Sequence, residues 1–135
     1  MTPSTDAPME LDGLRVLIVE DESLLSLLLE DMLAELGCQV VGSASSVPEA
    51  IEAVGKVDAG AAILDIKLGD QKSFPVAEAL AARGIPFVFA TGYGDGQVDD
   101  RWRDHYVLQK PFAQDQLAEV LARALSSRGR SARDR

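Results

Sequence analysis

"LRVLIVE", residues Leu14 to Glu20, is a short and nearly continuous run of apolar and β-branched residues. A strand that is buried on both faces of a parallel sheet reads as such a run, whereas a strand with one wet face alternates apolar with polar residues. The stretches "AAILDI" at 61–66 and "PFVFAT" at 86–91 have the same character. The sequence therefore predicts a parallel sheet that is covered on both faces.

The segments between these runs have helical patterns. Two of them stop at a glycine, Gly37 or Gly84, which is a common residue just after the end of a helix. We expect strands over 14–20, 39–44, 61–66, 86–91 and 106–109, helices over 23–36, 48–56, 75–83 and 113–127, and a weaker helical candidate over 95–105.

Regular alternation of strands and helices with short links leaves few topologies, because crossovers between parallel strands are right-handed. The predicted fold class is α/β, with a doubly wound, parallel, five-stranded sheet. In such sheets ligands bind beyond the carboxyl ends of the strands, which is where functional residues are expected.

The 135 residues suffice for one domain. Residues 1–12 mix Pro, Thr, Ser and Asp without periodicity and are expected to form a flexible leader, followed by a domain over 13–127 and a basic flexible tail over 128–135. The single cysteine, Cys38, cannot form an internal disulfide and is expected to pack as a small residue.

The charge balance and the hydropathy pattern exclude several classes of protein. The formal charge is −9, from 22 acidic and 13 basic residues, which argues against nucleic-acid binding. The N-terminus has neither the basic start nor the apolar core of a signal peptide, and the longest apolar stretch is interrupted by acids and too short to span a membrane. We expect a cytoplasmic protein that binds neither nucleic acid nor membrane.

Chemically active residues gather at the predicted strand ends. Glu20 and Asp21, Asp65, Thr91 and Lys110 each stand at or just after the end of a strand. Three carboxylates raise one another's pKa unless a cation neutralises them. Oxygen ligands of this kind suit Mg²⁺, with Mn²⁺ as an alternative, whereas Zn²⁺ would require His or Cys.

The remaining groups suit a phosphoryl ligand. The Lys110 ammonium and the Thr91 hydroxyl can bind phosphoryl oxygens, and Gly92 leaves backbone N–H groups accessible to an anion. Transfer of a phosphoryl group to a carboxylate gives an acyl phosphate, and Asp65, at the end of a central strand, is the best-placed acceptor.

Four motifs in this order resemble the receiver domains of two-component response regulators, from Leu14 to about Ser127: "IVEDE" at 18–22, "AILDIKLGD" at 62–70, "FATG" at 89–92 and "QKPF" at 109–112. The resemblance implies a flavodoxin-like (βα)5 fold with strand order 2-1-3-4-5. It also implies that the Lys110–Pro111 bond is cis.

The resemblance further implies a role for each site residue. Asp65 is the phosphoacceptor, with Thr91 as the switch hydroxyl and Lys110 as the ion-pairing cation. The implied metal ligands are Glu20, Asp21, Asp65 and the backbone carbonyl of Lys67, and the implied backbone contacts to the phosphoryl group come from Ile66 and Gly92.

Two departures from the family pattern concern the switch. Many receivers have an aromatic residue three positions before the lysine, where this chain has Val107, and Tyr106 beside it should face the other way. "FATGYG" is similar to a single-domain subset named for its Phe-Ala-Thr-Gly...Tyr motif, in which Tyr93 is the candidate to replace that aromatic. Tyr93 and Lys67 are also candidates to tune the lifetime of the phosphoryl group.

The resemblance implies a stand-alone signalling receiver rather than an enzyme with external substrates. It would accept a phosphoryl group from a phosphohistidine on a sensor histidine kinase or a histidine phosphotransfer protein, catalysing only its own phosphorylation and dephosphorylation. Its output would be a contact between a downstream protein and the face formed by the fourth helix, fifth strand and fifth helix, with the chain a monomer or weak dimer.

Three alternatives remain open from the residues. They are a phosphate sink or shuttle in a phosphorelay, an unreactive receiver-like binding module, and a magnesium-dependent phosphohydrolase of small molecules. The phosphohydrolase would need a second acid where Lys67 stands.

The first predicted helix carries more leucines than one core stripe needs. Its apolar residues span too wide an arc to face the core together, which predicts an apolar surface for a phosphodonor or another protein; they are Leu24, Leu25, Leu28 and Leu29.

Overall fold

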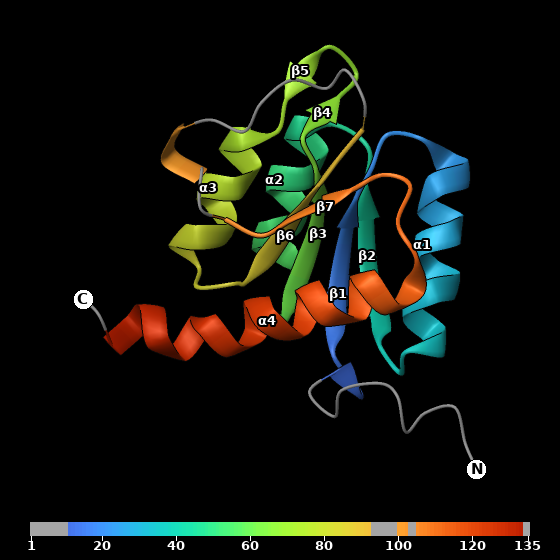
Figure 1. Cartoon of the computed structure of the whole chain (residues 1–135). Coiled ribbons are helices and arrows are strands. Elements are labelled where there is room, and N and C mark those ends of the chain that lie inside the picture. The colour runs from blue at the N-terminus through green and yellow to red at the C-terminus, as the bar shows by residue number, and fades with distance from the viewer. Residues whose placement is uncertain (1–10, 93–99, 103–104, 134–135) are drawn as a thin grey trace.

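A five-stranded parallel sheet forms the centre of the structure, which is a computed structural model that describes residues 11–92, 100–102 and 105–133. The strands are β1 (Arg15–Val19), β2 (Gln39–Ala44), β3 (Ala61–Asp65), β6 (Phe87–Thr91) and β7 (Val107–Gln109). They lie in the order β2-β1-β3-β6-β7, and every neighbouring pair is parallel. When these five are counted along the chain, the order is 2-1-3-4-5, which confirms the predicted fold (Figure 1).

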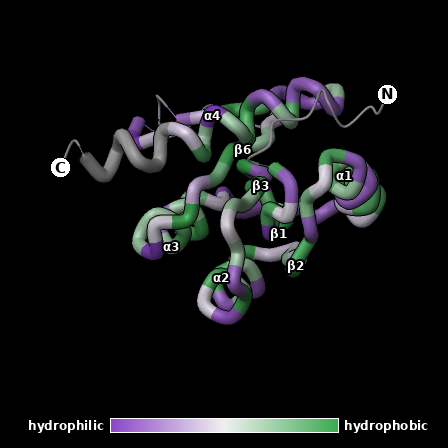
Figure 2. Tube along the Cα trace, turned by 90° about the horizontal axis from the view of Figure 1, so that it is seen from below, coloured by the Kyte–Doolittle hydropathy of each residue, from purple (hydrophilic) through white to green (hydrophobic). Residues whose placement is uncertain are grey.

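Helices cover both faces of this sheet (Figures 1 and 2). The helices α1 (Ser23–Glu35) and α4 (Gln114–Arg133) contribute to one buried cluster, and α2 (Val47–Lys56) and α3 (Phe74–Ala82) contribute to the other. Among the described residues, no helix is both long and apolar enough to cross a membrane.

The three central strands β1, β3 and β6 supply side chains to both clusters in turn. In β1, Val16 and Ile18 pack toward α1 and α4, whereas Leu17 and Val19 pack toward α2 and α3. Successive side chains of a strand point to opposite faces, so a continuous apolar run is what two covered faces require.

The glycine stops lie where the pattern predicted them. Gly37 and Gly84 follow the ends of α1 and α3 with φ of 89° and 70°, in the left-handed region that side chains with a Cβ rarely enter.

An antiparallel hairpin that the sequence pattern did not indicate lies between β3 and α3. It consists of β4 (Lys67–Leu68) and β5 (Gln71–Lys72), joined through Gly69 at φ 63°. Strands of two residues are too short to produce a period, so only the turn residues could have suggested them.

The weak helical candidate at 95–105 is described only in part. Its described portion includes a single 3-10 turn at Asp100–Trp102, and 95–99 and 103–104 lie outside the described residues. Trp102 is 9% exposed and contacts the rings of Phe87 and Phe89 edge-on. It therefore packs the turn onto the sheet, as expected for a core aromatic.

Two described segments lie outside the predicted domain range of 13–127. Leu11, assigned to the flexible leader, is fully buried in the cluster under α1 and α4, so the folded part begins by that residue. The last helix does not end at Ser127, because α4 continues to Arg133.

Candidate functional site

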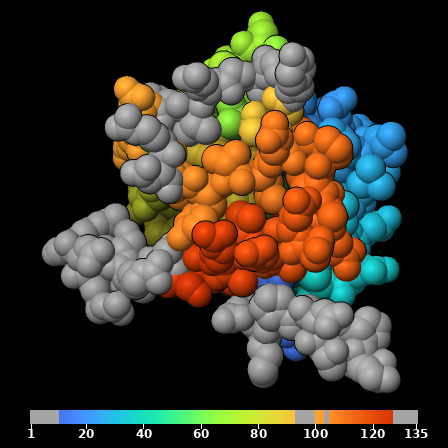
Figure 3. Space-filling model, in the orientation of Figure 1, coloured from blue at the N-terminus to red at the C-terminus, as the bar shows by residue number. Residues whose placement is uncertain are grey.

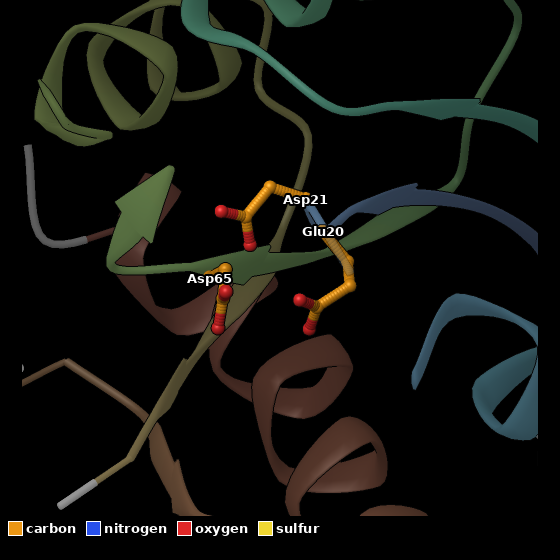
Figure 4. A group of neighbouring side chains, drawn as sticks. All are labelled: Glu20, Asp21 and Asp65. Carbon is orange, nitrogen blue, oxygen red and sulfur yellow. The ribbon is translucent and has the colours of Figure 1, made fainter. Parts of the chain in front are cut away.

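The carboxyl ends of the strands bring three carboxylates together. Glu20 and Asp21 follow β1, and Asp65 is the last residue of β3, the neighbouring strand. One oxygen from each lies within 4.8 Å of the others. In Figure 4 the side chains of Glu20 and Asp65 both extend downward, and the carboxylate of Asp21 lies above that of Asp65.

Asp65 is a buried acid that pairs with Lys110. The residue is 4% exposed, and its Oδ1 lies 2.6 Å from the Nζ of Lys110. Burial raises the pKa of the Asp65 carboxyl from 3.8 to about 7; the hydrogen bond from Lys110 opposes that shift and the negative charge of Glu20 adds to it. The carboxylate is therefore desolvated, as suits an oxygen nucleophile whose charge is balanced by neighbouring cations.

Lys110 connects the ends of several strands. It follows β7 at a cis bond to Pro111, and its backbone N–H donates to the Thr91 carbonyl at 2.8 Å. Its Nζ lies 3.1 Å from Oε1 of Glu20 as well as 2.6 Å from Asp65. Partial burial alone would lower the pKa of Lys110, but Asp65 and then Glu20 outweigh it and raise the pKa, so the ammonium stays charged.

The two adjacent acids have different partners. Glu20 is 5% exposed and its Oε2 accepts the backbone N–H of Glu22 at 3.1 Å. Asp21 is exposed and its Oδ2 accepts the N–H of Gly69 at 2.8 Å. The hairpin turn thus orients Asp21. The Gly-Asp pair at 69–70 indicates a turn, but no local signal tied that turn to an acid 48 residues away.

The donor set fits a hard divalent cation. The Lys110 ammonium pairs with Glu20 and Asp65, two of the three carboxylates, so full ionisation of the cluster leaves an excess of negative charge that a cation would neutralise. All three offer oxygen, the ligand atom that Mg²⁺ prefers. Lys67, whose carbonyl the family resemblance adds to this set, begins β4 two residues after Asp65.

Thr91 ends β6 and lies at the same edge of the sheet. Its side chain is partly buried, and its Oγ1 donates to the Gly92 carbonyl at 3.4 Å. Tyr93, the predicted switch residue, lies outside the described residues.

The backbone N–H of Ile66, an expected contact to the phosphoryl group, has a partner within the sheet. Its backbone N–H donates to the Ala90 carbonyl at 3.0 Å and so extends the pairing of β3 with β6. In this conformation that donor is used within the sheet and is not directed at a ligand.

Val107 and Tyr106, at the start of the fifth strand, face opposite sides, as the alternation of side chains along a strand predicts. Val107 is 38% exposed on β7, whereas Tyr106 packs against the cluster under α1 and α4. No aromatic side chain therefore occupies the usual switch position on this strand.

An apolar groove of about 430 Å³ adjoins the site. We call it the α1 groove; its apolar lining consists of Leu25, Leu28, Leu29, Met32, Pro111 and Phe112, and Glu20 and Lys110 also line it. On the same helix, Leu24 and Leu27 are 69% and 57% exposed, and Leu27 lines a separate pocket toward the end of β2. The predicted apolar surface on the first helix is thus present and continues to the charged site. Figure 3 shows α1, in blue, at the margin of the face built by β7 and α4.

The arrangement of acids, hydroxyl and lysine agrees with a family match. The model of the response regulator receiver domain matches residues 16–122. The chain belongs to the response regulator receiver family. Receiver domains of two-component systems have this flavodoxin-like sheet, so fold and sequence agree.

Individual relatives support the assignment. SdrG from Sphingomonas melonis Fr1 is 53% identical, with a TM-score of 0.77 over 84% of this receiver chain and 97% of that chain. A BeF3-activated conformation of SdrG, attributed to Pseudomonas melonis Fr1, is 54% identical with a TM-score of 0.71, over 82% and 95% of the two chains. The transcriptional regulatory protein PdtaR of Mycobacterium tuberculosis is 33% identical over 128 residues, which span 92% of this chain but only 62% of PdtaR.

Proposed function

We propose that this receiver accepts a phosphoryl group on Asp65 from a phosphohistidine, in a reaction that requires Mg²⁺, and signals through a protein contact that depends on phosphorylation. The proposal is carried by one observation. Asp65 is buried at the end of a central strand, 2.6 Å from the Nζ of Lys110 and within 4.8 Å of two further carboxylates.

The transfer follows from these contacts. A carboxylate oxygen of Asp65 forms a bond to phosphorus as the P–N bond to the donor imidazole breaks, and the imidazole takes up a proton. A divalent cation held by the acids would neutralise charge on the transferred group. Lys110 binds a phosphoryl oxygen, and Thr91 donates its hydroxyl to another. Positioning and charge neutralisation supply most of the catalysis in reactions of this kind.

The α1 groove is the proposed docking site for the phosphodonor protein. It is apolar, it lies on exposed leucines of α1, and its lining includes Glu20 and Lys110 of the acceptor site. A sensor histidine kinase or a histidine phosphotransfer protein would present its phosphohistidine there. The downstream protein would bind the face formed by the 3-10 turn at 100–102, β7 and α4.

The intact mass of the protein tests the proposal. After incubation with Mg²⁺ and a small phosphodonor such as acetyl phosphate, we expect one phosphoryl adduct on the wild type. The adduct should be absent without the metal and absent in Asp65→Asn. An adduct that persists in Asp65→Asn would place the acceptor elsewhere. No adduct with any donor, with Mg²⁺ binding intact, would favour an unreactive binding module.

A further inference from the structure

Lys110 is held by two acids rather than one. Its Nζ lies 2.6 Å from Asp65 Oδ1 and 3.1 Å from Glu20 Oε1, and the side chains of these acids are 5% and 2% exposed. Because the Lys110 backbone follows β7 and is bound to Thr91 at the end of β6, the side chain must reach across the ends of β6 and β3 to meet Glu20. Glu20, just after the end of β1, is farther from β7 along the sheet than Asp65 at the end of β3.

Both carboxylate oxygens of Glu20 are engaged by groups of the protein. Oε1 pairs with Lys110, and Oε2 accepts the N–H of Glu22 at 3.1 Å. Its backbone is also fixed, since its N–H donates to Ala44 at 3.0 Å. Asp21 differs, because it is exposed and only its Oδ2 has a hydrogen bond among the described contacts.

We propose that Glu20 acts chiefly as a positioning residue that holds the Lys110 ammonium at the acceptor carboxylate, and not as a direct ligand of the cation that the family resemblance assigns to this site. This role rests on the proposed function, because holding the ammonium serves the transfer of a phosphoryl group to Asp65. Once Asp65 carries a phosphoryl group, its carboxylate no longer pairs with the lysine as an anion, and Glu20 remains to keep the ammonium in place.

The proposed role of Glu20 depends on the length of its side chain. An aspartate at position 20 would be shorter by one methylene, about 1.5 Å. Its carboxylate would retain the charge beside the cation site, but the present 3.1 Å contact with Lys110 would open beyond ion-pairing distance. Glu20→Asp therefore separates the positioning of Lys110 from the supply of negative charge, and Glu20→Gln removes the charge while keeping the length.

Two measurements on the full chain test the inference without phosphorylation. In the metal-free protein, the ammonium ¹H–¹⁵N signal of a lysine held between two carboxylates should be sharp and protected from exchange. We expect this Lys110 signal to broaden in Glu20→Asp. In Mg²⁺ titrations followed by amide NMR, we expect the dissociation constant of Glu20→Asp to stay within about threefold of the wild type, while that of Asp21→Asn rises by about tenfold or more.

Phosphorylation by acetyl phosphate supplies the third measurement. At saturating Mg²⁺ the maximal rate of Glu20→Asp and Glu20→Gln should fall by about tenfold, because Lys110 is no longer held at the transferred group. Half-saturating Mg²⁺ in Glu20→Asp should stay near the wild-type value. The opposite split, with a large rise in half-saturating Mg²⁺ and an unchanged maximal rate in Glu20→Asp, would overturn the inference and make Glu20 a metal ligand. If the wild type takes up no phosphoryl group, the proposed function fails, and the ammonium signal and Mg²⁺ affinities still decide the role of Glu20.

Discussion

The two helical layers differ in how completely they bury their apolar side chains. Among the described residues, α2 leaves one large apolar side chain exposed, Ile51, and begins at a side-chain cap, where Ser46 accepts the N–H of Glu49. The α1 helix leaves three exposed, Leu24, Leu27 and Leu28, and its N-cap residue makes no side-chain capping bond within the described residues. The α1 helix therefore keeps an apolar surface beside the acceptor site, whereas α2 leaves only Ile51 exposed among its described large apolar side chains.

The largest effect on stability is expected in the layer under α2 and α3. Phe89 is fully buried, and its ring meets those of Phe74 and Phe87 edge-on at 5.8 and 5.4 Å. Phe89→Ala should lower the free energy of unfolding by about 3–5 kcal/mol, measured by urea denaturation. Leu24→Ala, on the exposed layer, is the control and should cost less than about 0.5 kcal/mol. Equal losses would contradict the difference between the layers.

The next largest effect is the pH dependence of stability that Asp65 causes at the end of β3. Burial raises the pKa of Asp65 in the folded protein from 3.8 to about 7, so the folded state binds this proton more tightly than the unfolded chain does. The resulting stabilisation is complete below about pH 4 and is lost as the pH rises through 7. Relative to Asp65→Asn, the metal-free wild type should lose about 2–4 kcal/mol over that window. Denaturation of both proteins from pH 4 to 8 measures this difference, and a flat difference would show that the pKa is not raised.

A smaller effect is expected at the start of α2. Ser46→Ala removes the side-chain oxygen that accepts the Glu49 N–H at 3.3 Å, and should lower the free energy of unfolding by about 1 kcal/mol. The matched control is Glu22→Ala at the start of α1, which removes no capping bond within the described residues and should change stability by less than about 0.5 kcal/mol. A reversed order of the two losses would show that α1 is the better-capped helix.

The smallest effect on stability should accompany a large effect on transfer. Leu28, which is 47% exposed, lines the α1 groove. Leu28→Gln should change the free energy of unfolding by about 0.5 kcal/mol. It should slow phosphorylation by a phosphohistidine protein by about tenfold, because apolar contact is lost, yet leave the rate with acetyl phosphate unchanged.

The control for Leu28→Gln is Ile51→Gln on α2, which has a similar exposure of 42% and does not line the groove. It should leave both rates unchanged. A slower reaction with acetyl phosphate in Leu28→Gln would indicate that the substitution disturbs the acceptor site itself.

Much of the fold was predictable because each element carries its own signal. The continuous apolar runs at 14–20, 61–66 and 86–91 required a sheet covered on both faces, and the glycines at 37 and 84 marked the helix ends. The hairpin of β4 and β5 had no such signal, because two-residue strands have no period. The burial of Leu11 was missed because one leucine among polar residues has no pattern.

For the candidate site, the sequence by itself determined which groups stand at the strand ends, because parallel strands all end at one edge of the sheet. Only the tertiary structure decided how these groups are paired. Glu20 and Asp21 are adjacent in sequence, yet one is buried against Lys110 and the other is exposed and bound to the turn at Gly69. Those partners lie 90 and 48 residues away along the chain, and contacts over such separations depend on how the strands are ordered and not on local propensity.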